Sequence, residues 1–204
     1  MAHQKLDFDG VVQAWDAAGE ESIHPLWSVD QNRYWESGRH QAQQITQHAK
    51  EGARVVDFGC GNGRLTIPLV QLGYDVLAVD SSSTMLDRLE KNAVAAGVAV
   101  TSIQSDGSDL AATLGRKKAD VIVARAVLIH HDYDGVRRLV TDLAKALKKG
   151  GVLIADWPLA PNPGERDTWI SVTTWNPATR LAAAADAGLA PVAVSTEPTV
   201  WRKE

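Results

Sequence analysis

The stretch Val55-Val-Asp-Phe-Gly-Cys-Gly-Asn-Gly-Arg64, VVDFGCGNGR, decides the fold, because a short apolar run leads directly into three glycines at alternate positions. The apolar run predicts a buried strand. The glycines predict a tight turn with positive φ angles, whose bare backbone a ligand can approach closely. In open α/β sheets, ligands bind at the carboxyl ends of the strands. We therefore expect a ligand-binding turn after the first strand of an α/β domain.

Further apolar runs without strict polar alternation follow, and helix-like segments separate them. Together with the first run they predict strands that are covered on both faces, as in a parallel sheet. These strands are Arg54–Phe58, Asp75–Val79, Val98–Gln104, Asp120–Ala124 and Val152–Ala155. Two short strands within residues 191–204 predict an antiparallel hairpin at the sheet edge. The alternation predicts right-handed crossovers and a doubly wound, Rossmann-like sheet of seven strands, most of them parallel.

Two apolar stripes at helical spacing predict helices between the strands. One stripe consists of Met85, Leu89, Ala93 and Ala96, and the other of Val136, Leu139, Leu143 and Leu147. Thr84 and Asp87 are spaced as a capping box for the first helix. Gly150 is expected to take the left-handed cap of the second helix. Asn176-Pro177 predicts the N-cap and first residue of a later helix.

Two segments lie outside this alternation. Residues 1–51 are expected to form a helical cap with one long helix from Asp30 to Lys50. The segment from Trp157 to Trp175 contains three prolines and no clear periodicity, which is typical of a lid or a binding loop. We expect one domain over residues 1–204, with the cap at 1–51 and the core at 52–204.

The composition limits the classes of function. The 204 residues are 45% hydrophobic and 23% charged, which suits one soluble globular domain. No apolar run is long enough for a membrane helix and the N-terminus lacks a signal peptide, so we expect a cytoplasmic protein. The single cysteine excludes a disulfide framework and a cysteine-based zinc site; the six histidines leave other metals open, but we assign no metal ligands. The net charge of -4 gives no sign of nucleic-acid binding.

The glycine spacing separates three classes of ligand. A nucleoside triphosphate loop requires Gly-Lys-Ser/Thr, and the sequence contains no such tripeptide. A dinucleotide loop requires a third glycine at the position that Arg64 occupies. The pattern present is Asp-x-Gly-x-Gly-x-Gly.

On this pattern the chain resembles the class I S-adenosylmethionine-dependent methyltransferases. Five motifs of that family occur in order, and the resemblance covers residue 53 to the C-terminus. The motifs are DFGCGNG at 57–63, VLAVDSSSTML at 76–86, QSD at 104–106, ADVIVARAVLIHH at 119–131 and LKKGGVLIAD at 147–156. The resemblance implies a Rossmann-like fold, S-adenosylmethionine as cofactor and methyl transfer as activity.

Four aspartates support this interpretation independently. Asp57, Asp80, Asp106 and Asp156 fall at the carboxyl ends of predicted strands, so the ligand crevice is expected to be acidic. A sulfonium, an ammonium, a ribose diol and an adenine amino group all suit carboxylates, and the cofactor has no phosphate to repel them. Asp80 is placed to accept both ribose hydroxyls. The alternative is that some of these aspartates merely cap helices or end strands.

The family implies roles for further positions. Asp106 would receive the adenine amino group, with Ser81 and Met85 against the adenine. Ala124 and Arg125 would pass beside the methionine portion. The cofactor-binding set is completed by the turn residues Gly59, Cys60 and Gly61 and by Gly107.

Methyl transfer needs a base only when the acceptor must lose a proton. His130 and His131 follow the fourth core strand and are candidates for this base, and Asp156 is a third. The alternative for the histidines is packing or cofactor enclosure. Cys60 is expected to fit the turn as a small residue, because nothing near it in the sequence would lower the pKa of its thiol.

Within the N-terminal cap, Trp35 and Arg39 would share one face of the long helix. We expect Trp35 to cover the cofactor and Arg39 to approach its carboxylate. The alternative, equally weighted, is that Tyr34, Trp35 and Ile45 anchor the helix to the core.

The expected partner is a small-molecule methyl acceptor that reacts at oxygen or nitrogen. After the fourth core strand the chain lacks the Asn/Asp-Pro-Pro-Tyr/Phe motif of enzymes that act on amino groups of bases or on glutamine. Two basic clusters, at 115–118 and 145–149, precede strands and are expected at the edge opposite the cofactor, so nucleic acid is an unlikely partner. A methyltransferase on RNA or protein, and a cofactor-binding module without turnover, are the alternatives.

Overall fold

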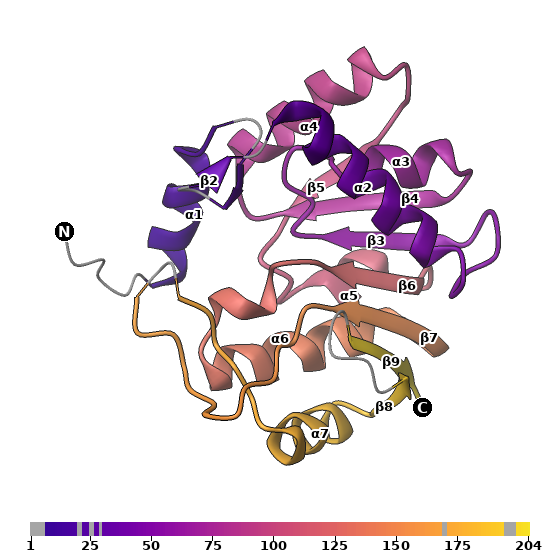
Figure 1. Cartoon of the computed structure of the whole chain (residues 1–204). Coiled ribbons are helices and arrows are strands. Elements are labelled where there is room, and N and C mark those ends of the chain that lie inside the picture. Colours follow the sequence, from indigo (N-terminus) through magenta and orange to yellow (C-terminus); the bar gives the residue numbers. More distant parts are fainter. Residues whose placement is uncertain (1–6, 20–21, 25–26, 29, 169–170, 194–198) are drawn as a thin grey trace. The chain divides into compact units, whose positions relative to one another are not determined.

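A computed structural model describes residues 7–19, 22–24, 27–28, 30–168, 171–193 and 199–204 (Figure 1). The chain divides into two compact units. One is residues 12–106, and the other is residues 107–204 together with the start of the chain up to Val11.

The unit of residues 12–106 is built on three parallel strands. They are β3 (Arg54–Phe58), β4 (Asp75–Asp80) and β5 (Thr101–Gln104). Strand β4 pairs with β3 on one side and with β5 on the other, so the carboxyl ends of all three strands lie at one edge. This confirms the predicted strands, except that β5 begins at Thr101 and not at Val98. The Val98 N–H donates to the Ala93 carbonyl at 3.0 Å and closes the preceding helix, with Gly97 at φ +69°.

Helices α3 (Thr66–Gln71) and α4 (Ser83–Ala95) connect these strands. The predicted capping box of Thr84 and Asp87 is wrong. The N-cap is Ser82, whose hydroxyl accepts from the Met85 N–H at 3.0 Å. Ser82 can take this role because its backbone is still extended after β4, as N-cap residues require. Ala96 is the exposed C-cap residue and not part of the buried stripe.

The sequence predicts a helical N-terminal cap, but the structure shows that the cap also contains strands. Helix α1 (Phe8–Asp16) is followed by a two-stranded antiparallel sheet of β1 (Ser22–His24) and β2 (Trp27–Ser28). Helix α2 (Gln31–Ile45) begins after its N-cap Asp30, as predicted, but ends before Lys50. At its end the Thr46 hydroxyl donates to the Gln43 carbonyl at 2.7 Å.

The second unit contains four strands. Strands β6 (Ala119–Ala124) and β7 (Leu147–Ala155) are parallel, and β8 (Leu189–Ala193) and β9 (Thr199–Lys203) form the predicted antiparallel hairpin, with β9 paired to β7. The sequence also predicts a turn between the two strands of this hairpin at Glu197-Pro198, which lies outside the described residues. The strands of the larger sheet follow the order β5-β4-β3-β6-β7-β9-β8, which confirms the doubly wound, mostly parallel sheet.

The helical elements of this unit are α5 (Leu110–Leu114), the 3-10 turn η1 (Leu128–His130), α6 (Tyr133–Ala146) and α7 (Pro177–Asp186). The Asn176 side chain caps α7 as predicted. Helix α6 ends one residue before Leu147, which starts β7 opposite Ala119. Gly150, at φ +79°, therefore serves the register shift inside β7 and not a helix cap.

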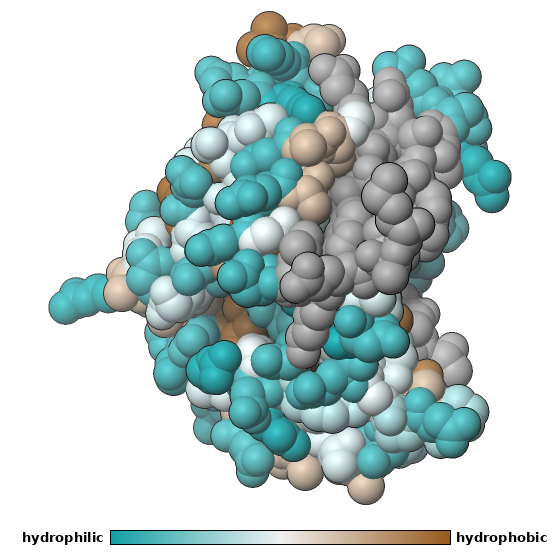
Figure 2. Space-filling model, turned by 90° about the vertical axis from the view of Figure 1, so that its left-hand side faces the viewer, coloured by the Kyte–Doolittle hydropathy of each residue, from teal (hydrophilic) through white to brown (hydrophobic). Residues whose placement is uncertain are grey.

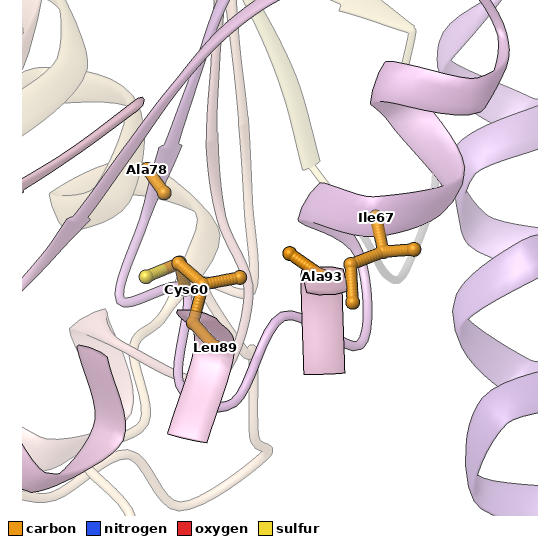
Figure 3. Packing of buried hydrophobic residues seen from close by; sticks show 5 residues of the cluster. All are labelled: Cys60, Ile67, Ala78, Leu89 and Ala93. Carbon is orange, nitrogen blue, oxygen red and sulfur yellow. The ribbon is translucent and has the colours of Figure 1, made fainter. Parts of the chain in front are cut away.

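Each unit has its own buried side chains. In residues 12–106 a hydrophobic cluster joins Cys60 of the glycine turn to side chains of α3, β4 and α4, namely Ile67, Ala78, Leu89 and Ala93 (Figure 3). In the other unit Trp157, Trp175 and Trp201 are at most 2% exposed. The visible face in Figure 2 is mostly hydrophilic, with hydrophobic residues scattered over the part that is described.

Gly38 brings α2 into backbone contact with the residue that follows the glycine turn. A Cβ added at Gly38 would lie 2.0 Å from the Arg64 carbonyl oxygen. Alanine normally stabilises a helix interior relative to glycine. At position 38 we expect alanine to destabilise the protein instead, because the added Cβ would clash with the Arg64 backbone, which cannot move aside as a flexible side chain can.

We expect Gly38→Ala to lower the free energy of unfolding by about 3 kcal/mol, measured by urea denaturation. Gly164→Ala is the matched control, since an added Cβ there meets nothing within 4 Å, and its effect should stay within about 0.5 kcal/mol. A Gly38→Ala protein as stable as the wild type would contradict the close packing of α2.

Candidate functional site

The glycine turn after β3 is folded back against the neighbouring strand β4. The N–H groups of Gly59 and Cys60 both donate to the Val79 carbonyl, at 2.8 and 3.0 Å. Gly59, Gly61 and Gly63 all have positive φ angles, of 74°, 54° and 93°. A Cβ added at Gly61 would meet no atom within 4 Å. The backbone of Gly61 therefore borders open space, as the sequence predicts for a ligand-binding turn.

Asp80 ends β4 with its carboxylate held in one orientation. One oxygen accepts from the Gly61 N–H at 2.8 Å and the other accepts from the Ser82 N–H at 2.9 Å. Burial raises the pKa of Asp80, these N–H bonds oppose the rise, and Asp16 adds to it. The Ser81 backbone also interacts favourably with this carboxylate, which is therefore oriented by consecutive backbone groups and can accept further donors.

Asp57 is a buried residue of β3, two positions before Gly59. Its side chain is 2% exposed and accepts from the Thr66 hydroxyl at 2.6 Å. Burial raises the pKa of Asp57 to about 6, against the lowering effects of Thr66 and Arg64. This burial favours a structural role for Asp57, while its predicted place in the acidic lining stays a prediction.

Cys60 contributes packing. Its thiol is buried in the hydrophobic cluster. Burial raises the pKa of the thiol well above its usual value, and the nearby carboxylates of Asp80 and Asp57 act in the same direction. A thiol that stays protonated is a poor nucleophile, which agrees with the role predicted from the sequence.

The other predicted adenine-side residues lie at the same strand edge of this unit. Ser81 follows β4, and its carbonyl accepts from the Gln104 side chain at 2.9 Å. Met85 is buried in the first turn of α4. Asp106 follows β5 and is exposed.

Helix α2 holds the glycine turn through contacts that the sequence did not reveal. The buried Tyr34 hydroxyl donates to the Asn62 side chain at 2.6 Å. The Arg64 guanidinium donates to the Ser37 hydroxyl at 2.9 Å and lies over the Tyr34 ring at 5.6 Å. The only sequence signal was a glycine, Gly38, inside a helical pattern.

These contacts bear on the predicted cap residues. Tyr34 and Ile45 are buried, which matches the anchoring alternative. Trp35 is partly buried against the hydrophobic cluster of Cys60, and Arg39 is exposed on the same helix. Their expected roles toward the cofactor stay predictions.

In the second unit, Asp156 holds the turn that follows β6. One carboxylate oxygen lies 3.2 Å from Arg125 Nε, and the other accepts from the Ala126 N–H at 2.7 Å. Ala126 has a φ of +55° and is the one residue other than glycine with positive φ in the described part of the chain. Ala124, which ends β6, is fully buried, and Gly107 has a φ of +92°.

The two histidines lie beyond this turn. His130 ends η1, and His131 follows it with its ring stacked on Phe8 at a centroid distance of 5.4 Å. The His131 carbonyl accepts from the Thr173 hydroxyl at 2.6 Å, and the Ile129 carbonyl accepts from the Thr173 N–H at 3.1 Å. Thr173 thus fastens its part of the chain to the histidine-bearing turn.

The sequence predicts a lid or a binding loop over 157–175, but the two tryptophans that flank this segment are buried. Trp157 and Trp175 are 0% and 1% exposed, with ring centroids 5.5 Å apart. Arg166, inside the segment, is also buried, and burial lowers its pKa against the opposing effect of Asp132 and Asp7. The segment is packed structure at both ends, because large aromatic rings gain most from burial.

The described residues contain no group of three or more His, Cys, Asp or Glu side chains that is arranged for a metal ion. None of their helices is both long and apolar enough to cross a membrane.

The chain is similar in sequence to known methyltransferases. Residues 55–151 match the family model described as a methyltransferase domain. A ribosomal protein L11 methyltransferase from Nitratiruptor sp. is 28% identical over 151 residues, which are 67% of this chain and 51% of the relative. A ubiquinone biosynthesis O-methyltransferase from Chelativorans sp. is 30% identical over 103 residues, 50% of this chain and 39% of the relative. The chain spans about half or less of the length of these two relatives.

Among solved structures, the chain is similar to magnesium protoporphyrin IX methyltransferase from Synechocystis with bound S-adenosylhomocysteine. The TM-score is 0.66 at 20% sequence identity, over 94% of each chain. At this identity the likeness concerns the fold.

The buried Asp57 predicts a pH dependence of stability. Between its unfolded pKa of 3.8 and its folded pKa of about 6, the unfolded chain releases the proton while the folded chain keeps it. Rising pH therefore destabilises the fold across this window and has no further effect above it. We expect Asp57→Asn to lack this decline and to be more stable than the wild type by roughly 2 to 3 kcal/mol at pH 7.

Urea denaturation from pH 4 to pH 7 measures the difference. Asp134→Asn, at an exposed side chain, controls for the change in net charge. If Asp57→Asn and wild type lose stability in parallel across the window, the buried ionisation is wrong.

Proposed function

We propose that this chain, whose residues 55–151 match a methyltransferase domain, is a class I S-adenosylmethionine-dependent methyltransferase and transfers the methyl group of S-adenosylmethionine to an oxygen or nitrogen of a small-molecule acceptor. The observation that carries the proposal is the Asp80 carboxylate, fixed by the N–H groups of Gly61 and Ser82 at the end of β4. Such a carboxylate is pre-oriented to accept a ribose diol.

The residues of the unit 12–106 fit this cofactor. The open space at Gly61 admits a ligand against bare backbone, and no phosphate has to approach the carboxylates. We assign Asp80 to the ribose, Asp106 to the adenine amino group, and Ser81 and Met85 to the adenine ring. Gly59 and Gly61 would border the methionine portion, while Cys60 and Asp57 support the turn.

The remaining cofactor contacts are assigned from the family pattern. Ala124 and Arg125 would pass beside the methionine portion, and Gly107 would complete the turn after Asp106. Trp35 would cover the cofactor, and Arg39 would approach its carboxylate.

The cofactor supplies a methyl group that is already activated on a sulfonium, so the protein's main task is to position the acceptor nucleophile. Where the acceptor must lose a proton, His130 or His131 would take it, since imidazole titrates near neutral pH. Both residues lie on or next to η1, which Thr173 fastens in place.

A small-molecule acceptor is supported by the net charge of -4 and by the similarity to a ubiquinone biosynthesis O-methyltransferase. The similarity to a ribosomal protein methyltransferase favours a protein acceptor as the second candidate. The cytoplasmic location stays a prediction from the sequence.

We expect Asp80→Asn to weaken S-adenosylmethionine binding by roughly 10- to 100-fold, because the amide replaces one acceptor oxygen by a donor and removes the charge. Titration calorimetry measures the affinity. Asp87→Asn is the matched control, since it makes the same substitution on the exposed face of α4. Equal affinity of Asp80→Asn and wild type would refute the ribose assignment.

The acceptor class can be tested by size fractionation. Wild-type protein with S-adenosylmethionine should release S-adenosylhomocysteine when given the small-molecule filtrate of a cell extract, and Asp80→Asn should not. Release with the macromolecular fraction alone would favour a protein or RNA acceptor. Release with neither fraction would favour a binding module without turnover.

A further inference from the structure

The turn after β6 adopts a backbone conformation that its sequence does not favour. Ala126 has a φ of +55°, in the left-handed region where a Cβ meets the neighbouring carbonyl oxygen. Such a residue persists only where the surrounding structure holds it, and strained residues of this kind gather at functional sites. A neighbouring group must therefore hold Ala126 in this conformation.

Asp156 is that group, because it binds both sides of the turn. Its own N–H donates to the Ala124 carbonyl at 3.3 Å, which extends the pairing of β6 with β7. Its side chain accepts from the Ala126 N–H at 2.7 Å and pairs with Arg125 Nε at 3.2 Å. The carboxylate thus offers one oxygen to the strained residue and the other to the residue before it.

Asp156 is itself held by the packing of the next residue. Trp157 is 0% exposed and lies 5.5 Å from Trp175 and 5.4 Å from Trp201, measured between ring centroids. Its carbonyl accepts from the Arg180 guanidinium at 2.6 Å. A carboxylate that follows a buried strand and precedes a buried tryptophan has little freedom to turn elsewhere.

We propose that Asp156 is a positioning residue, which holds Ala126 left-handed and thereby sets the place of Arg125 and of the turn η1 that carries His130. This inference rests on the proposed function and revises the sequence-based assignment of Asp156 as a base. Both oxygens of the carboxylate already have partners within the turn. The carboxylate is used to hold the strained Ala126 in place, and this use does not require it to accept a proton.

Glycine at position 126 makes the proposal testable, since glycine adopts a positive φ without strain. We expect Asp156→Ala to weaken the binding of S-adenosylhomocysteine by about 10-fold or more, through misplacement of the turn. In the Ala126→Gly background the same substitution should cost at most about 3-fold, because the turn no longer has to be forced. Titration calorimetry on the four proteins gives both ratios.

The control is Asn176→Ala, which removes another side-chain cap of a backbone N–H and should not be relieved by Ala126→Gly. Wild-type affinity in Asp156→Ala, or an undiminished loss in the Ala126→Gly background, would overturn the proposal. Urea unfolding of the same four proteins tests the coupling without any cofactor. Asp156→Ala should lower the unfolding midpoint more in the wild type than in the Ala126→Gly background, and equal shifts would also overturn it. A wild type that binds no S-adenosylhomocysteine would instead contradict the proposed function.

Discussion

The hydrogen bond from the Gly61 N–H to the Asp80 carboxylate is the contact on which the geometry of the glycine turn depends. It joins the end of β4 to the left-handed turn that leaves β3, so each element fixes the other. The Ser82 N–H binds the second oxygen and so links the same carboxylate to the start of α4. Desolvation works against this arrangement, because burial raises the pKa of Asp80 and the N–H donors only partly compensate. A carboxylate kept in this state is ready to gain further hydroxyl donors.

The elements around this contact keep the turn rigid. The hydrogen bond from Thr66 to Asp57 joins α3 to β3 on either side of the turn, and Cys60 packs its thiol into the hydrophobic cluster. Helix α2 closes the other side through Tyr34 and Asn62. The part of the N-terminal segment formed by α2 therefore acts as a brace for the glycine turn. A rigid turn lowers the entropy that a ligand must spend on binding.

The second unit uses the same principle at the turn after β6. A carboxylate at the end of a strand again binds a backbone N–H of a neighbouring turn, here Asp156 with Ala126. The difference lies in the support, which is a cluster of buried tryptophans. The prolines and missing periodicity between Trp157 and Trp175 had suggested a lid or a binding loop. The burial of both tryptophans shows that the two ends of this segment are packed.

The sequence by itself determined where most core strands lie along the chain, the glycine turn, the N-cap at Asn176 and the resemblance to methyltransferases, because these follow from local periodicity and from residue types at fixed spacing. Helix and strand ends were less certain: Ser82 and not Thr84 caps α4, and Leu147 belongs to β7, since the competing hydrogen bonds come from neighbouring strands. Only the tertiary structure decided that Asp57 is buried, that Gly38 touches Arg64, and that Asp156 holds Ala126. These features depend on desolvation and on contacts between residues far apart in the chain, and no local pattern encodes them.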